Sequence, residues 1–562
     1  MSLKGRILSG VLIFIISLFL IRGPLLRYFV ANRVTGVEAK YGLNIDYQKL
    51  RFSGLSGIKL SSLSVVPSSQ KSVTDTLLSV DYLEARLSFF KLLFFKTDLK
   101  ELNADNIKIS FVKRDSLSNF DFLFRSAQKS TKQRSVDSSN VNYARVTDRM
   151  FSLLLKVLPS QADIQKLKVS YTKDSYNLEV NLPAFKIVDN KFSVVISADE
   201  NRSVSVMAAD GILDDSERKI SARLFARENH KFSVPFLKYR WGPDLQFDTL
   251  AFEISATHKG SESTELKGSA LAKGISVYHT RISPENVLLE RGEFNYKFLV
   301  GRNFFELDSS SIATINRFSF SPYLRAQKDK KWHITASLNK SWFPSDDLFS
   351  SLPKGLFNNL EGLRTEGKLR YHFYLDLDFN NLDSLKLESV LKPDKFRIVS
   401  FGKTNFRFIN DEFEYTAYEN GAPVRSFTVG PSNPNFRTLD RISPFLQMAV
   451  LQSEDGGFFY HNGFLIESIK GALIQDIKER RFRRGGSTIS MQLVKNVFLN
   501  RHKTLARKFE EVLIVWLIET NRLSPKDRMF EVYMNIIEWG PMIYGANEAS
   551  RFYFDKDAKD IN

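Results

Sequence analysis

The sequence contains no cysteine among its 562 residues. Disulfide bonds, thiolate metal sites and cysteine nucleophiles are therefore excluded. The chain also lacks the ligand spacing of zinc fingers and the aromatic motifs of RNA-recognition modules. The 80 Lys and Arg residues exceed the 63 Asp and Glu residues, which gives a formal net charge of +17. This charge favours an anionic partner such as phospholipid headgroups or pyrophosphate, whereas the missing motifs argue against nucleic acid.

The apolar run at the N-terminus is short. It extends from Ile7 to Ile21, follows Lys4 and Arg6, and stops at 22–24 (RGP). At about 1.5 Å per residue it spans roughly 22 Å, less than a hydrocarbon core of about 30 Å. No small-x-small cleavage site follows, so we expect an uncleaved signal anchor over residues 1–30 rather than a cleaved signal peptide. Either interpretation places the bulk of the chain outside the cytoplasm, with a cytoplasmic N-terminus.

Residues 38–429 are predicted to be mainly β. Apolar and polar residues alternate in several segments, as in half-buried antiparallel strands. The clearest are 192–197 (FSVVIS), 219–227 (KISARLFAR) and 369–379 (LRYHFYLDLDF). The polar segment 126–140 is predicted to be a loop, and helical spacing predicts an amphipathic helix over 143–157. We expect a long sheet or a sandwich.

The segment 430–436 (GPSNPNF) marks a change of pattern and is predicted to be a linker. Residues 437–562 are predicted to be mostly helical. Apolar residues recur at helical spacing in 464–480 and 504–521. A further helix is predicted to start at 524–527 (SPKD), with Ser524 as its cap.

Two neighbouring carboxylates, Glu454 and Asp455, lie in the segment 453–463 (SEDGGFFYHNG). A carboxylate beside glycines and aromatic residues suits a general base. Such pairs are more often solvated surface groups, so the motif alone leaves both interpretations open.

A basic, glycine-rich turn leads into a helix at 483–496 (RRGGSTISMQLVKN). Backbone N–H groups at a helix N-terminus near Ser487, together with flanking cations, form an anion site. Gln492 and Lys495 are three residues apart and share a face of this helix. The alternative is a basic turn before a surface helix.

Two further motifs follow. Lys503, Arg507 and Glu511 recur at every fourth position, so they share one helix face. This face is either a solvated stripe of ion pairs or a functional surface. The last motif is 530–540 (FEVYMNIIEWG), which contains Asn535.

Together these motifs resemble glycosyltransferase family 51, the peptidoglycan glycosyltransferases found as penicillin-binding-protein domains and as monofunctional transglycosylases. The family pattern is E-D-x-x-F-x-x-H-x-G, G-G-S-T-I-x-x-Q-L-x-K-N, R-K-x-x-E and E-x-Y-x-N, and all four parts occur here in order. The resemblance covers residues 437–562 and implies a mostly α-helical, lysozyme-like lobe. The composition of 38–429 resembles that of AsmA-like envelope proteins. The expected fold is therefore multidomain, with an anchor, a β region and an α lobe.

The resemblance implies a role for each matching residue. Glu454 matches the family's general base and Glu511 its second catalytic glutamate. Contacts to the substrate are implied for Asp455, Ser487, Thr488, Gln492, Lys495, Lys503, Arg507 and Asn535. Lys503 stands where the family often has arginine, which keeps the charge but loses the bidentate fork. Whether a divalent cation, Mg or Mn, accompanies the pyrophosphate is left open.

The implied reaction is the polymerisation of lipid II into glycan strands, with inversion and release of undecaprenyl pyrophosphate. The implied partners are lipid II, the growing strand, the inner membrane and other cell-wall synthesis proteins. Two alternatives are an AsmA-like lipid-handling scaffold with a degenerate transferase lobe and a lysozyme-like glycan-cleaving enzyme, which also uses two carboxylates. The family's domain continues beyond 553–554 with further helices, so a chain ending at Asn562 is expected to be a fragment or a minimal lobe.

Overall fold

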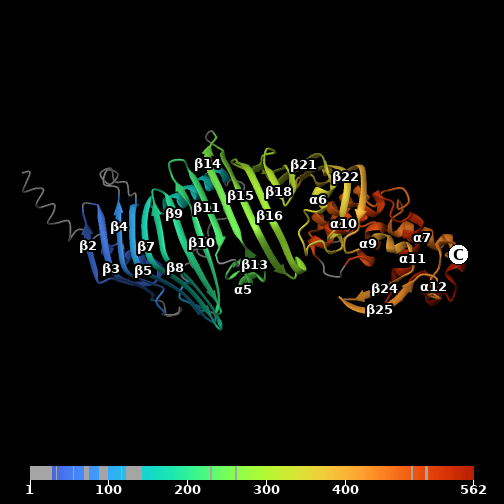
Figure 1. Cartoon of the computed structure of the whole chain (residues 1–562), viewed down its shortest axis with the longest axis horizontal. Helices are drawn as coiled ribbons and strands as arrows, with labels where there is room; N and C mark the ends of the chain where they lie inside the picture. The colour runs from blue at the N-terminus through green and yellow to red at the C-terminus, as the bar shows by residue number, and fades with distance from the viewer. Residues whose placement is uncertain are drawn as a thin grey trace, which may run out of the picture. The chain divides into compact units, whose positions relative to one another are not determined.

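The computed structural model of the chain (Figure 1) forms two units. The first comprises residues 1–242, 246–272 and 299–302, and the second comprises 243–245, 273–298 and 303–562. The structure describes residues 28, 30–32, 34–54, 56–68, 75–87, 99–115, 117–121, 142–157, 159–227, 231–259, 262–419, 421–481, 485–499 and 504–562.

Long strands make up most of the first unit, and the β prediction for this part of the chain is confirmed. The strands of residues 43–258 are β1 (Leu43–Asp46), β2 (Lys49–Ser53), β3 (Gly57–Pro67), β4 (Leu78–Leu87), β5 (Leu99–Arg114), β6 (Leu117–Ser118), β7 (Gln161–Lys173), β8 (Tyr176–Val188), β9 (Lys191–Glu200), β10 (Ser203–Asp214), β11 (Lys219–Ala226), β12 (Phe232–Ser233), β13 (Asp244–Phe247) and β14 (Thr249–His258). Most neighbours pair antiparallel, whereas β5 and β7 pair in parallel.

The registers of these strands place apolar side chains opposite one another. Val80 of β4 lies opposite Ile107 of β5, which lies opposite Leu167 of β7. On the other face, Lys168, the neighbour of Leu167 on β7, forms an ion pair with Glu179 of β8, with 2.5 Å between Nζ and the carboxylate. Because side chains alternate along a strand, one face of the sheet is apolar and the other is charged.

Two helices accompany this sheet. The predicted amphipathic helix is confirmed as α4 (Tyr143–Val157). Its Phe151 and Leu155 are buried in a cluster with Ala256 of β14. The short helix α5 (Leu237–Trp241) follows β12, and Tyr239 stacks on Tyr176 with 3.8 Å between the ring centroids.

The strands of residues 264–429 include the sheet on which the helical lobe rests. They are β15 (Thr264–His279), β16 (Ser283–Val300), β17 (Phe304–Leu307), β18 (Ile312–Ile315), β19 (Phe318–Phe320), β20 (Pro322–Lys328), β21 (Trp332–Pro344), β22 (Arg364–Asp378), β23 (Lys386–Ser400), β24 (Phe413–Glu419) and β25 (Ala422–Val429). Helix α6 (Ser345–Phe349) and the 3-10 turns η2 (Asn358–Leu360), η3 (Leu382–Ser384) and η4 (Phe406–Asn410) connect them. Strands β24 and β25 form a hairpin of their own.

Residues from 439 onward are mostly helical, as predicted. The elements are η5 (Leu439–Arg441), α7 (Pro444–Glu454), α8 (Ile466–Glu479), α9 (Ile489–Val497), α10 (Leu505–Thr520), α11 (Lys526–Ile536), β26 (Glu538–Gly540), β27 (Ile543–Tyr544), α12 (Ala546–Phe554) and η6 (Ala558–Asp560). The prediction that Ser524 caps α11 is wrong. Pro525 occupies the cap position, so the helix begins one residue too late for the Ser524 side chain to reach its free N–H groups.

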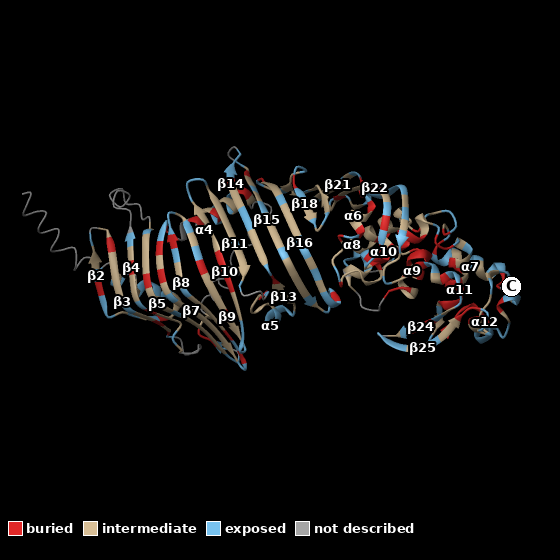
Figure 2. Ribbon diagram, in the orientation of Figure 1, coloured by how far each residue is buried: buried red, intermediate tan, exposed pale blue. Residues whose placement is uncertain are grey.

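One hydrophobic core joins these helices to the strands before them. Leu369 of β22 and Phe406 of η4 are fully buried in the same cluster as Leu493 of α9 and Phe530 of α11. The Phe406 ring packs edge-on against Phe498, with 5.4 Å between centroids. Figure 2 shows buried residues along α9 and α11. The helices therefore rest on a platform of β strands within one unit.

The predicted signal anchor and the predicted loop 126–140 lie outside the described residues, apart from a few positions near residue 30. Within the described ranges, no helix has the length and apolarity needed to cross a membrane. The AsmA-like resemblance of the β region stays a prediction.

Candidate functional site

The N-terminal caps of three helices set where the predicted site residues begin. Ser443, before α7, accepts a hydrogen bond from the N–H of Phe445, with Pro444 at the first helical position. Thr488 caps α9 and Thr504 caps α10 in the same way. Such caps satisfy N–H groups that have no partner within the helix. Because the caps set where each helix begins, they determine the position of Glu454 in the last turn of α7, of Gln492 in α9 and of Glu511 in α10.

Glu454 is exposed, and its side chain forms a hydrogen bond between α7 and α9. Its Oε2 accepts a hydrogen bond of 2.7 Å from Nε2 of Gln492. The Gln492 Oε1 accepts a bond of 3.2 Å from the hydroxyl of Tyr533 on α11. Burial raises the pKa of Tyr533, and the nearby Glu454 and Asp455 carboxylates raise it further, so this hydroxyl keeps its proton. Three helices therefore orient one exposed carboxylate.

Asp455 is buried, in contrast to its neighbour, and it organises the loop after α7. Both of its oxygens lie 2.9 Å from Nε2 of His461. Its Oδ2 also accepts the backbone N–H of Ile489 at 3.0 Å, in the first turn of α9. Asp455 thus stabilises the start of α9, where a carboxylate is also favoured by the helix dipole.

The loop that follows packs closely against α10. The Thr488 hydroxyl donates to the carbonyl of Gly463 at 2.7 Å. Gly463 has a φ of 85°, and a Cβ there would lie 2.5 Å from Cγ1 of Val515. Only glycine fits this position without displacing α10. Thr488 is committed to this junction, so its substrate contact stays a prediction.

Glu511 is almost fully buried, with 1% of the residue exposed. Its Oε1 lies 2.6 Å from Nζ of Lys508, one turn earlier on α10. The same Nζ donates to Oγ of Ser487 at 3.2 Å, just before α9. The interpretation of Glu511 as part of a solvated stripe is therefore wrong. Lys508 was not assigned a role from the sequence, although the R-K-x-x-E motif contains it.

Lys495 and Arg507 are half-buried on α9 and α10. Arg507 lies in the first turn of α10, where its backbone N–H donates to the cap hydroxyl of Thr504. Lys503 and the two arginines at 483–484 lie outside the described residues. Their assignment to the site stays a prediction.

Asn535 on α11 forms hydrogen bonds to the backbone of Arg437, in the segment before the helices. Its Oδ1 accepts the N–H of Arg437, and its Nδ2 donates to the carbonyls of Arg437 and Glu531, each at 2.8 to 2.9 Å. These bonds occupy both ends of the amide. Its predicted contact with substrate is not tested by this arrangement.

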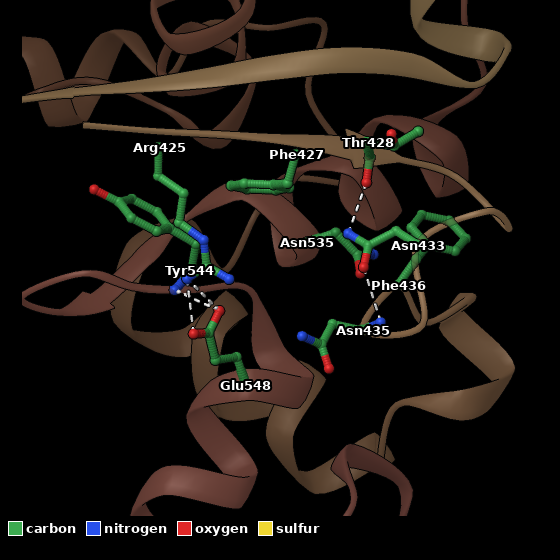
Figure 3. A pocket seen from close by; sticks show the side chains of 9 residues that line it. All are labelled: Arg425, Phe427, Thr428, Asn433, Asn435, Phe436, Asn535, Tyr544 and Glu548. Atoms are coloured by element: carbon green, nitrogen blue, oxygen red, sulfur yellow. Dashed lines mark hydrogen bonds and ion pairs between the residues drawn. The ribbon is translucent and has the colours of Figure 1, made fainter. Parts of the chain in front are cut away.

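A small pocket with a cavity volume of about 40 Å³ lies beside Asn535. Figure 3 shows Arg425 and Glu548 meeting on one side of it, where their side chains approach to 2.8 Å, with Asn433 and Asn435 across from them. Neither predicted catalytic glutamate lines this pocket. It is separate from the Glu454–Gln492 arrangement.

No three Asp, Glu or His side chains gather as metal ligands in the described part of the chain. The site, as built, offers carboxylates from α7 and α10 and cations from α9 and α10.

Comparison with known proteins bears on the same helices. Residues 420–562 match the transglycosylase family model. A biosynthetic peptidoglycan transglycosylase of Chromobacterium violaceum is 45% identical over 123 residues, which cover 22% of this chain and 53% of that protein. The protein of the same description from Acinetobacter baylyi is 40% identical over 131 residues, which cover 23% of this chain and 58% of that protein.

The chain thus spans about half the length of these relatives. The match confirms the resemblance of the C-terminal part of the chain to the peptidoglycan transglycosylases.

Proposed function

We propose that this protein is a peptidoglycan glycosyltransferase that polymerises lipid II by inverting transfer and releases undecaprenyl pyrophosphate. One observation carries the proposal. Glu454 and Glu511 both converge on the segment 487–492, Glu454 through Gln492 and Glu511 through Lys508 and Ser487. This segment therefore lies between the exposed Glu454 carboxylate and the Lys508 ammonium group. The names of the relatives point to the same chemistry.

In the proposed mechanism, Glu454 takes the proton from the 4-hydroxyl of the acceptor sugar. Gln492 donates to Oε2 of this carboxylate, and in the proposal Oε1 of Glu454 receives the proton. The acceptor oxygen then bonds to the anomeric carbon of the donor. The bond from that carbon to the pyrophosphate breaks, and its electron pair leaves with the pyrophosphate. Attack opposite the leaving group inverts the anomeric carbon.

The leaving pyrophosphate needs positive charge and hydrogen-bond donors. Lys508 lies beside the Ser487 hydroxyl at 3.2 Å. In the proposal, Lys495 of α9 and Arg507 of α10 supply further positive charge. Glu511 orients Lys508 through the ion pair of 2.6 Å. Cleavage of a finished glycan involves no pyrophosphate, so cations proposed to bind this group favour synthesis over lysozyme-like hydrolysis.

Purified full-length protein is expected to polymerise lipid II, and Lys495→Ala and Arg507→Ala are each expected to weaken donor binding. A charge-assisted hydrogen bond contributes about 1.5–3 kcal/mol, so each loss raises the donor Kd by roughly 10- to 150-fold. The measurement is binding of a labelled lipid-linked donor in detergent. Lys470→Ala is the matched control, because Lys470 pairs with Glu467 on the separate helix α8. Unchanged binding in both site variants would remove these residues from the donor site.

The proposal also places the chain in the bacterial inner membrane as a single-pass protein, with its bulk in the periplasm. The support is the apolar run between Lys4 and Arg22, and the lipid tail of the proposed substrate. A reporter that works only after export is expected to be active when it is fused after Asn562. A reporter that works only in the cytoplasm is expected to be inactive there. Activity of a reporter that works only in the cytoplasm would contradict both the location and the substrate.

One observation favours the lipid-handling alternative. The apolar face that runs across β4, β5 and β7 is only partly buried, as at Ile107 and Leu167. Such a face suits acyl chains. A full-length protein that binds lipid but forms no polymer from lipid II would favour this alternative over the transferase.

A further inference from the structure

A second glutamate, Glu510, lies directly before the proposed catalytic Glu511. It is 4% exposed, and burial raises its pKa, while the N–H groups that donate to it lower the pKa in part. Its Oε1 accepts the backbone N–H of Asn359 at 2.7 Å and the Asn359 Nδ2 at 3.3 Å. The family pattern R-K-x-x-E leaves the position of Glu510 open. This carboxylate is therefore a feature that the motif does not explain.

Asn359 is itself held from two sides. It lies in η2, before β22, and its neighbour Leu360 is 1% exposed in the shared core. Its Oδ1 accepts the hydroxyl of Thr404 at 2.8 Å, from the loop after β23. Both η2 and this loop precede residue 420, where the match to the transglycosylase family begins. The β platform thus contacts helix α10 at Glu510.

Helix α10 has a second attachment to the platform at Trp516. The indole Nε1 donates to the carbonyl of Leu391 in β23 at 3.1 Å, and the ring packs against Phe396 with 5.1 Å between centroids. Trp516 follows Glu510 by six residues, or about 9 Å along the helix axis. The two attachments therefore hold α10 at two positions along its axis.

We propose that Asn359 is a positioning residue for glycosyl transfer, which holds Glu510 and thereby sets the rotation of the first turns of α10. The inference rests on the proposed function of Glu511 and Arg507. A buried carboxylate that loses its donors is driven toward water. Release of Glu510 would turn α10 and draw Glu511 and Lys508 away from Ser487. The β platform is in this way part of the catalytic apparatus and not only a spacer.

The test compares two full-length variants that each remove one attachment of α10. Glu510→Leu removes the acceptor of both Asn359 bonds and is expected to lower kcat per folded molecule by roughly 10- to 100-fold, because small misplacements of reacting groups have effects of this size. Asn359→Ala keeps the backbone N–H bond of 2.7 Å and loses only the bond of 3.3 Å from Nδ2, so its expected loss of kcat is smaller. Trp516→Phe removes the hydrogen bond to Leu391 and is expected to lower Tm with kcat near that of the parent. Glu510→Gln keeps the Oε1 acceptor and is expected to retain most of the rate, whereas Glu510→Leu loses it.

Hydrogen exchange supplies a readout that does not need activity. Amides of residues 510–513 are expected to exchange faster in Glu510→Leu than in Trp516→Phe, even if the parent makes no polymer. A parent without polymer would overturn the proposed function, and equal exchange in both variants would overturn the positioning role. Parent-like kcat in Glu510→Leu, or an equal loss of kcat in Trp516→Phe, would also overturn it. Loss of all activity in Glu510→Gln would instead make Glu510 the reacting carboxylate.

Discussion

Glu454→Gln is expected to lower the rate of glycan polymerisation by roughly 10²- to 10⁴-fold, the usual contribution of a general base. The glutamine side chain has nearly the same size and an oxygen that accepts the hydrogen bond from Gln492. It does not take a proton from the acceptor sugar. Because Glu454 is exposed and its neighbours are retained, the fold and donor binding are expected to survive. The measurement is the initial rate of polymer formation, with Kd for the donor measured alongside.

Two variants separate this effect from general damage. Glu467→Gln makes the same chemical change on α8, at a side chain that is 80% exposed, and is expected to leave the rate unchanged. Asp455→Asn acts on the buried carboxylate that holds His461 and the N-terminus of α9. It is expected to lower Tm and to reduce the rate less than Glu454→Gln does. A larger rate loss in Asp455→Asn, measured per folded molecule, would move the base to Asp455.

Phe406→Ala is expected to lower the free energy of unfolding by about 3–5 kcal/mol, the usual cost of truncating a fully buried phenylalanine. Phe406 has no exposed surface and packs edge-on against Phe498, directly after α9. It lies before residue 420, outside the part that matches the transglycosylase family. The large effect is expected because strands and helices share one core. The measurement is denaturant unfolding followed by circular dichroism at the wavelength of the helix signal.

The control for this prediction is Phe552→Ala on α12, because Phe552 is 68% exposed. It makes the same truncation in the same unit, and its expected cost is within about 0.5 kcal/mol, as for surface substitutions. Equal losses in both variants would show that burial at Phe406 does not decide stability. A Phe406→Ala protein as stable as the parent would mean that the helices fold independently of the β platform.

Much of the fold could be predicted because local patterns carry it. Alternation predicted β9, β11 and β22, and helical spacing predicted α4, α8 and α10. The hairpin of β26 and β27 was missed because its strands have only three and two residues, too few to show alternation. The shared core was missed for another reason. Contacts such as Phe406 with Phe498 join residues 92 positions apart, and no local pattern reports them.

For the candidate site too, the sequence motifs identify some residues but do not report contacts between distant parts of the chain. The motifs identified Glu454, Gln492 and Glu511, which the structure places on α7, α9 and α10. They did not separate the exposed Glu454 from the buried Asp455, because adjacent residues differ in environment only once the helix end is placed. The contact of Asn359 with Glu510 spans 151 positions, and neither residue belongs to a motif. Lys508 could have been found, since it faces Glu511 at a spacing of three on a helix.

The most direct test of the account is the initial rate of lipid II polymerisation by purified full-length parent and Glu454→Gln protein in liposomes, with bound donor measured in the same samples. The account predicts polymer from the parent, almost none from the variant, and equal donor binding by both. Polymer formation by Glu454→Gln at the parent rate would contradict the assignment of the base. A folded parent that binds donor but forms no polymer would contradict the proposed function itself.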